Sequence, residues 1–171
     1  MDSTWITALI VVGLTALSIF FLSFLHRRAK RKEAARRQAH VDNILNENKI
    51  QLTEHESLRH AFIGMDAANG KLVYINYYEQ QTPAEIIDLK EIRLAKVDVL
   101  EHQTYEERDG KSRVADRQTQ VVQLVLPAKN TSGEKYTLPF YQLIYDDIGE
   151  MPELKQKATR WEQVVNRWIK P

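Results

Sequence analysis

The chain contains no cysteine among its 171 residues. Disulfide bonds, thiolate metal ligands and cysteine nucleophiles are therefore excluded. Glycine is scarce as well, with six residues in the whole chain, and no P-loop, GxGxxG or GxSxG pattern occurs. We expect neither a phosphate-cradling loop nor a nucleophile elbow.

Histidine pairs with the spacing of a zinc-protease helix are missing too. His55 and Glu56 begin such a pattern, but the next histidine is His60, five residues after the first. Five residues on a helix place the two rings about 140° apart, so one metal ion does not easily take both. We predict no metal site and no cofactor.

Paired carboxylates occur only as neighbours in sequence, at Asp146-Asp147 and Glu106-Glu107. Neighbouring side chains diverge on a helix or a strand, which makes them poor acid and base partners. Asp146 or Asp147 is better explained as the end of a strand or the cap of a helix. We predict no catalytic residue and no enzyme.

The net charge of +1 is unevenly distributed. Residues 26–37 hold seven Lys or Arg against the single acid Glu33, and the chain after Gln38 is mildly acidic. Duplex nucleic acid needs a broad basic face, so we predict no nucleic-acid partner for this later part.

One long hydrophobic run is present, at residues 5–25, without a charge. Its 21 residues suffice for a helix across the ~30 Å hydrocarbon core. A cleaved signal peptide is the alternative, but the flanks lack its basic start and its cleavage-like site. We predict a short tail at 1–4 and a single-pass transmembrane helix at 5–25. The basic flank predicts insertion in the inner (plasma) membrane with the N-terminus outside and the C-terminal domain cytoplasmic.

A basic helical stalk is predicted for residues 26–58, which contain no Pro or Gly. Within it, Arg27, Arg28, Lys30 and Arg31 are the candidates for contact with the membrane surface, which makes the lipid bilayer a predicted partner. The alternative is that the basic cluster only sets the orientation in the membrane and otherwise faces solvent. We favour this alternative for the cluster as a whole.

The same segment carries apolar residues at heptad-like spacing. Val41, Leu45, Asn48 and Leu52 follow one another at intervals of four, three and four. Two heptads with a polar residue inside are too few for a coiled coil. A homo-oligomer formed through the stalk is therefore an alternative that we do not favour.

After Arg59 the pattern changes to short β-rich runs separated by turns. Asn69-Gly70 is a strong hairpin signal between two of them, and Asp109-Gly110 and Ser132-Gly133 mark further turns. Three hairpin turns in sequence predict an antiparallel meander. The predicted strands cover residues 60–66, 71–78, 84–89, 92–103, 117–126 and 134–140.

An amphipathic helix is predicted at the C-terminus. Pro152 suits a first helical position. An apolar stripe follows at helical spacing and needs a sheet face to cover. Its residues are Leu154, Ala158, Trp161, Val165 and Trp168.

The segments AFIGMDAANGKLVYI, AEIIDLKEIRLAKVDVLE and YDDIGEMPELKQKATRWEQVVNRWI resemble those of uncharacterised bacterial membrane-tethered proteins with a pleckstrin-homology-like domain. The resemblance covers residues 60–170. It implies an α+β domain at 59–171, an antiparallel split β-barrel capped by the C-terminal helix. It also implies binding of peptides, proteins or lipid headgroups. The loop Asp66–Lys71 has one cation and one acid, which departs from the headgroup-binding pattern.

Tyrosines give the one candidate recognition surface. Tyr74, Tyr77 and Tyr78 supply amphipathic contact area for a protein partner, although tyrosine is also simply a good strand residue. We therefore predict a membrane-anchored, non-catalytic binding or scaffolding module with a protein or peptide partner. A structural or assembly protein that self-associates through the stalk is the alternative.

Overall fold

The computed structural model describes Phe20, Phe21, Arg28 and residues 32–78, 84–108, 111–129 and 133–169, without the side chains of 103–117. The chain divides into two compact units, Met1–Lys49 and Ile50–Pro171. Each unit is considered by itself.

The first unit contains a polar helix at residues 32–47. An ion pair of 2.5 Å between Arg37 and Glu33, one turn apart, supports it. The helix ends in a turn at which Lys49 takes a positive φ of 53°. Asn48 and Leu52, two of the four heptad-like positions, therefore lie beyond the helix, which is shorter than the stalk expected from composition.

The predicted transmembrane helix is contradicted. Residues 5–25 lie outside the described residues except for Phe20 and Phe21. Among the residues that the structure does describe, no helix is both long enough and apolar enough to cross a membrane. An apolar run spans a bilayer only where a continuous helix bonds its own amides, and the helix at 32–47 is strongly charged. The single-pass topology and the plasma-membrane localisation were inferred from that helix, and both are wrong on this finding.

Of the predicted membrane-contact residues, Arg28 is described, whereas Arg27, Lys30 and Arg31 lie outside the described residues.

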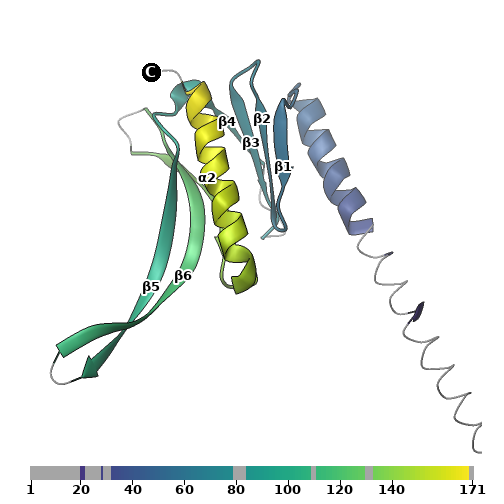
Figure 1. The fold of residues 1–171 in the computed structure, drawn as a ribbon. Helices are drawn as coiled ribbons and strands as arrows, with labels where there is room; N and C mark the ends of the chain where they lie inside the picture. The colour runs from purple at the N-terminus through teal and green to yellow at the C-terminus, as the bar shows by residue number, and fades with distance from the viewer. Residues whose placement is uncertain are drawn as a thin grey trace, which may run out of the picture. The chain divides into compact units, whose positions relative to one another are not determined.

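The second unit begins with a four-stranded antiparallel sheet in the order β1-β2-β3-β4 (Figure 1). Gly70 lies in the turn after β2 with a φ of 65°, which confirms the hairpin predicted from Asn69-Gly70. β1 was not predicted and falls in the segment expected to be stalk. The strands are β1 (Glu54–Ser57), β2 (Ala61–Asp66), β3 (Lys71–Asn76) and β4 (Glu85–Asp88).

A three-stranded antiparallel sheet follows, in the order β5-β6-β7, and the chain then ends in a helix. Asp88 caps the short helix that leads from the first sheet, because its side chain accepts from Lys90 N at 2.9 Å. The elements are η1 (Leu89–Glu91), β5 (Lys96–Arg108), β6 (Lys111–Pro127), β7 (Lys135–Gln142), η2 (Ile148–Glu150) and α2 (Met151–Trp168).

The predicted pleckstrin-homology-like split barrel is also contradicted, because the described strands form two sheets and no closed barrel. β4 pairs with β3 and β5 pairs with β6, and η1 stands between β4 and β5. A strand ladder needs strands side by side, and the turn of η1 redirects the chain before β5 begins. The antiparallel strands and the C-terminal helix are present.

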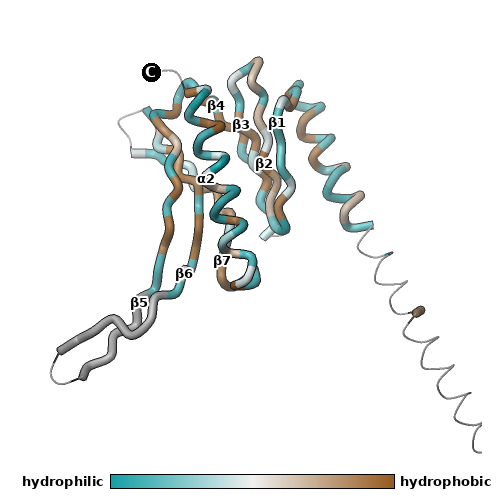
Figure 2. The backbone as a smooth tube through the Cα atoms, in the orientation of Figure 1, coloured by the Kyte–Doolittle hydropathy of each residue, from teal (hydrophilic) through white to brown (hydrophobic). Residues whose placement is uncertain are grey.

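α2 provides the shared core of the two sheets. Hydrophobic residues recur along α2 and along the strands (Figure 2). The buried stripe of α2 belongs to one cluster with residues of both sheets, such as Ile63 of β2 and Leu124 of β6. Trp161 is fully buried, and its Nε1 donates to Glu56 Oε2 of β1 at 2.9 Å. The helix is thus bonded to the first sheet while it packs on the second. The stripe comprises Leu154, Ala158, Trp161, Val164 and Val165.

β2 is buried at all six positions. On the face away from the α2 core, Leu52 lies against Gly64, and a Cβ at Gly64 would come within 2.8 Å of a Leu52 methyl group. The glycine therefore lets the segment before β1 cross this face of the sheet closely.

Replacement of Trp161 by phenylalanine is expected to lower the free energy of unfolding by about 2–4 kcal/mol. The change removes a charge-assisted hydrogen bond and leaves a cavity. Trp168→Phe is the matched control. Because Trp168 is 48% exposed, its replacement should lower the free energy of unfolding by less than about 0.5 kcal/mol. Chemical denaturation of both variants checks this, and equal effects would contradict the role given to Trp161.

Candidate functional site

Titratable side chains converge around Asp146, in the turn that follows β7. Asp146 is 6% exposed. Its Oδ2 accepts from the Tyr78 hydroxyl at 2.6 Å and from Gln142 N at 2.8 Å. His60 Nε2 lies 3.8 Å from Oδ1, too far for a hydrogen bond. The carboxylate therefore joins the end of β7 to the residues after β3 and before β2.

Three aromatic rings cover this carboxylate. His60 stacks on Tyr78 with ring centroids 5.0 Å apart, and Tyr78 contacts Tyr145 at 4.9 Å. The backbone holds the same segments together, since Tyr77 N donates to His60 O at 2.8 Å. These contacts exclude water from one side of Asp146, which strengthens its hydrogen bonds.

The buried tyrosines around this site keep their protons at neutral pH. Burial raises the pKa of Tyr78, and its hydrogen bond to Asp146 raises that pKa further. Burial, and then the negative charges of Glu85 and Asp146, raise the pKa of Tyr74. Burial also raises the pKa of Tyr141. The hydroxyls of Tyr74 and Tyr78 thus act as hydrogen-bond donors, and all three hydroxyls are poor bases or nucleophiles.

The cluster has the geometry of an anchor. A general base must reach the proton it takes, and the Asp146 oxygen Oδ2 already accepts from two groups of the protein itself. His60 Nε2 is buried without a hydrogen-bond partner among the described residues. Those residues also hold no group of three His, Asp or Glu that could bind a metal ion.

The consequence of this anchor is an exposed apolar turn, residues 143–148. Asp146 points inward, whereas Ile144 is 82% exposed, Ile148 is 61% exposed and Tyr145 is 47% exposed. Asp147 fixes the far end of the turn, because it forms a capping box with Glu150 on η2. Of the two acids singled out in the sequence, Asp147 is confirmed as a cap. Two fixed ends hold the isoleucines outward.

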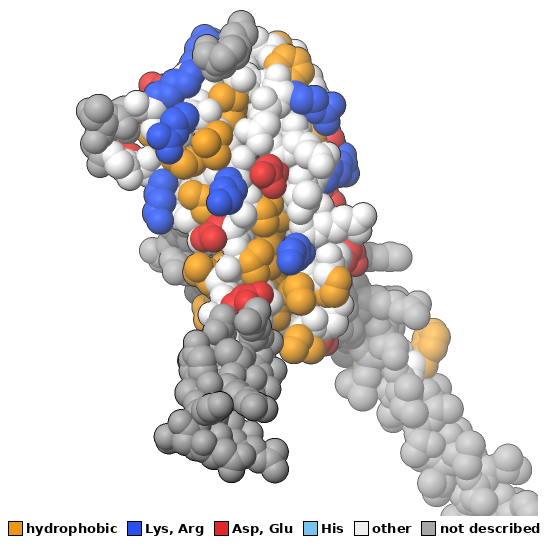
Figure 3. Space-filling view, turned by 60° about the vertical axis from the view of Figure 1, so that its left-hand side comes forward, with side chains coloured by type: hydrophobic (Ala, Val, Ile, Leu, Met, Phe, Trp, Pro, Cys, Tyr) orange, Lys and Arg blue, Asp and Glu red, His pale blue; other side chains and the backbone are white. Residues whose placement is uncertain are grey.

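The surface near this turn mixes apolar and charged side chains. Figure 3 views the second unit from the side of the β5-β6-β7 sheet, where hydrophobic side chains reach the surface among acidic and basic ones. Close to the turn in sequence lie Asp147, Glu150 and Glu153; Glu150 pairs with Arg59 at 3.0 Å and Glu153 with Lys157 at 2.8 Å. Asp147 adds an exposed negative charge to this rim, and the buried Asp146 lies beneath it.

The three tyrosines predicted to bind a protein lie inside this framework. Tyr74 is fully buried and donates its hydroxyl to Pro139 O at 2.5 Å. Tyr77 and Tyr78 are half-buried. Sequence reasoning missed Ile144 and Ile148, because a strand-like run such as LIY is ordinarily buried. Their only signal was the position beside two acids and before a helix start.

No family model, no curated protein and no solved structure matches this chain. The function must therefore be argued from the residues themselves.

Tyr78→Phe is expected to lower the free energy of unfolding by about 1.5–3 kcal/mol, since it removes a hydrogen bond to a buried carboxylate. Tyr136→Phe is the matched control, because Tyr136 is half-buried against the core and no hydrogen bond of its hydroxyl was found among the described residues. Thermal denaturation of the pair measures the difference. Equal losses of unfolding free energy in the two variants would show that the hydrogen bond from Tyr78 to Asp146 does not stabilise the fold.

The raised tyrosine pKa values predict alkaline behaviour as well. A group whose pKa is raised by folding stabilises the fold fully below its unfolded pKa of about 10 and ceases to do so as pH rises through the folded value. Stability should therefore fall above about pH 10. Near-ultraviolet absorbance should show Tyr74, Tyr78 and Tyr141 ionising only as circular dichroism reports unfolding. Ionisation of all seven tyrosines in a folded protein would contradict these shifts.

Proposed function

We propose that residues 50–171 form a non-catalytic module that binds another protein through the apolar turn. The observation that supports this most is the exposure of two isoleucines on a turn that a buried carboxylate holds in place.

Energetics favour the turn as a docking point. Full burial of an Ile side chain is worth about 1.5–3 kcal/mol, so two of them reach the magnitude of an interface hot spot. Because the turn is fixed before binding, little conformational entropy is lost when the partner covers it. Tyr145 adds the amphipathic ring that interfaces favour.

The charge around the turn specifies the partner further. Asp147 is exposed, and Asp146 adds a second negative charge beneath the rings. A complementary protein surface has an apolar pocket for Ile144 and Ile148 with Lys or Arg at its rim.

Photo-crosslinking in the full-length chain tests the proposal. A photoreactive phenylalanine analogue at Ile144 should give one dominant adduct in cells that naturally express the protein. Ile148→Asp in the same chain should reduce that adduct by about tenfold or more, since it places a charge in an apolar contact. The matched control puts the analogue at Leu94, another exposed hydrophobic residue.

Adducts of equal yield at both positions, or an adduct insensitive to Ile148→Asp, would contradict docking at the turn. An adduct with the mass of two chains would show that the turn binds a second copy in place of a different protein.

A further inference from the structure

A second feature lies at the other half of α2, where the helix borders the edge strand β5. β5 is hydrogen-bonded to β6 and ends the order of its sheet. Just before β5, Ala95 N donates to Asn166 Oδ1 at 2.8 Å, and Asn166 Nδ2 donates to Ala95 O at 2.9 Å. The Asn166 carboxamide thus makes the same two hydrogen bonds to Ala95 that a residue of a neighbouring strand would make.

The contact of Asn166 with Ala95 marks the edge at which backbone N–H and C=O groups of β5 point away from β6. Backbone groups of successive strand residues point to opposite edges, so Val97 and Val99 present their N–H and C=O groups on the same side as Ala95.

The register of the sheet agrees. Pro139 has no N–H and turns its carbonyl to Tyr74, so its pair with Gln123 is not a hydrogen-bonded one. Gln123 then bonds to Asp98 of β5, which leaves Val97 and Val99 facing the open edge.

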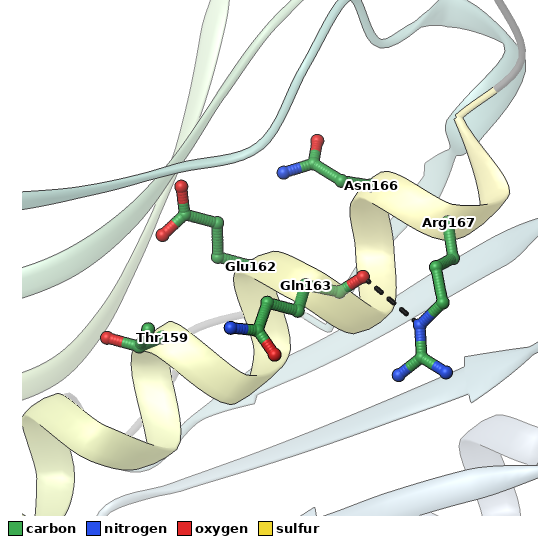
Figure 4. Close-up of a pocket in the computed structure, with 5 residues that line it drawn as sticks. All are labelled: Thr159, Glu162, Gln163, Asn166 and Arg167. Atoms are coloured by element: carbon green, nitrogen blue, oxygen red, sulfur yellow. Dashed lines mark hydrogen bonds between the residues drawn. The ribbon is translucent and has the colours of Figure 1, made fainter.

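A groove of about 570 Å³ lies beside α2, and its described lining residues all come from that helix (Figure 4). Asn166 lies at one end of the groove and Thr159 at the other, roughly 10 Å apart along the axis. Asn166 bonds to Ala95 just before β5, and α2 and β5 run in opposite directions in Figure 1. The lining residues are Thr159, Glu162, Gln163, Asn166 and Arg167.

Glu162 gives the Asn166 side of this groove a charge preference, whereas Arg167, the other charged lining residue, points to the opposite side of α2 (Figure 4). The Glu162 side chain is half-buried in the groove wall, and it makes no ion pair or hydrogen bond with any described residue. A carboxylate in that position gains most from a cation that enters the groove with a ligand. The side chains of Val97 and Val99 pack partly buried against the core, so it is their backbone that is available at the edge.

We propose that an extended segment of a partner protein adds to the open edge of β5, in the groove beside α2, with a Lys or Arg opposite Glu162. The backbone of Val97 and Val99 supplies the affinity through strand hydrogen bonds. Glu162 selects the basic side chain. Asn166 sets the end of the site, because it already occupies the edge at Ala95. This site differs from the apolar turn in place and in mode of binding.

Three fluorescent hexapeptides test the proposal on the full-length chain by anisotropy. The first alternates valine and threonine and has one central lysine. The second has glutamate in place of the lysine. The third keeps the lysine but is N-methylated at alternate backbone positions, so it has the same side chains without the strand donors. The lysine peptide should bind at least about tenfold more tightly than either of the others.

Glu162→Lys is the paired variant, and it should reverse the preference so that the glutamate peptide binds more tightly. Ile148→Asp is the control variant, which should leave all three affinities unchanged because it alters the apolar turn only. The proposal is overturned if N-methylation has no effect, if Glu162→Lys keeps the lysine preference, or if no peptide binds up to about 1 mM. It is also overturned if light scattering shows that a second copy of the chain occupies the edge and excludes the peptides.

Discussion

The second unit depends on one packing constraint, the burial of the α2 stripe between two sheets that share no strand ladder in the described chain. Without a ladder, side-chain packing and a few backbone hydrogen bonds of the η1 connection, such as Arg93 N to Pro127 O, hold the sheets in register with each other. Trp161 has the largest fully buried side chain, and its hydrogen bond to Glu56 is joined by the ion pair of Arg160 with Glu54 on the same strand. These contacts fix α2 against the first sheet, and its apolar stripe then fixes the second sheet.

The two proposed binding surfaces both follow from that placement. At the N-terminal end of α2, the sheets come close enough for Tyr74 to reach Pro139 and for Tyr78 to reach Asp146. Burial of the Asp146 carboxylate costs desolvation free energy, and the hydrogen bonds from its two donors offset that cost. The same hydrogen bonds fix the apolar turn. At the C-terminal half, Asn166 is held beside β5, which defines where an added strand ends. From Met151 to Glu162 α2 covers roughly 16 Å, so one partner can occupy the turn before the helix while another occupies the groove.

Local chemistry made part of this fold predictable. Asn69-Gly70 requires a positive φ, and the α2 stripe repeats at 3.6-residue spacing, so both could be read from the sequence. β1 could not, because Glu54 and Glu56 look like a solvated segment until Arg160 and Trp161 are in place.

Asp146 illustrates what the sequence could not show. Its partner Tyr78 lies 68 residues away, and no local pattern signals that contact. The same holds for the exposure of Ile144 and Ile148, which follows from the anchored turn. Strand runs likewise do not tell whether β4 and β5 pair or separate. The transmembrane helix predicted at 5–25 rested on length and hydropathy alone, and no helix of the described residues meets both criteria.

The central claim is that Asp146 holds residues 143–148 rigid, so that the isoleucines are presented in a fixed arrangement. Backbone ¹⁵N relaxation of the free protein measures this directly, through the order parameters of the amides in the turn. The account predicts values near those of the sheet, about 0.85, as for rigid backbone. Values below about 0.6 would mean a flexible loop and would contradict a preformed docking surface.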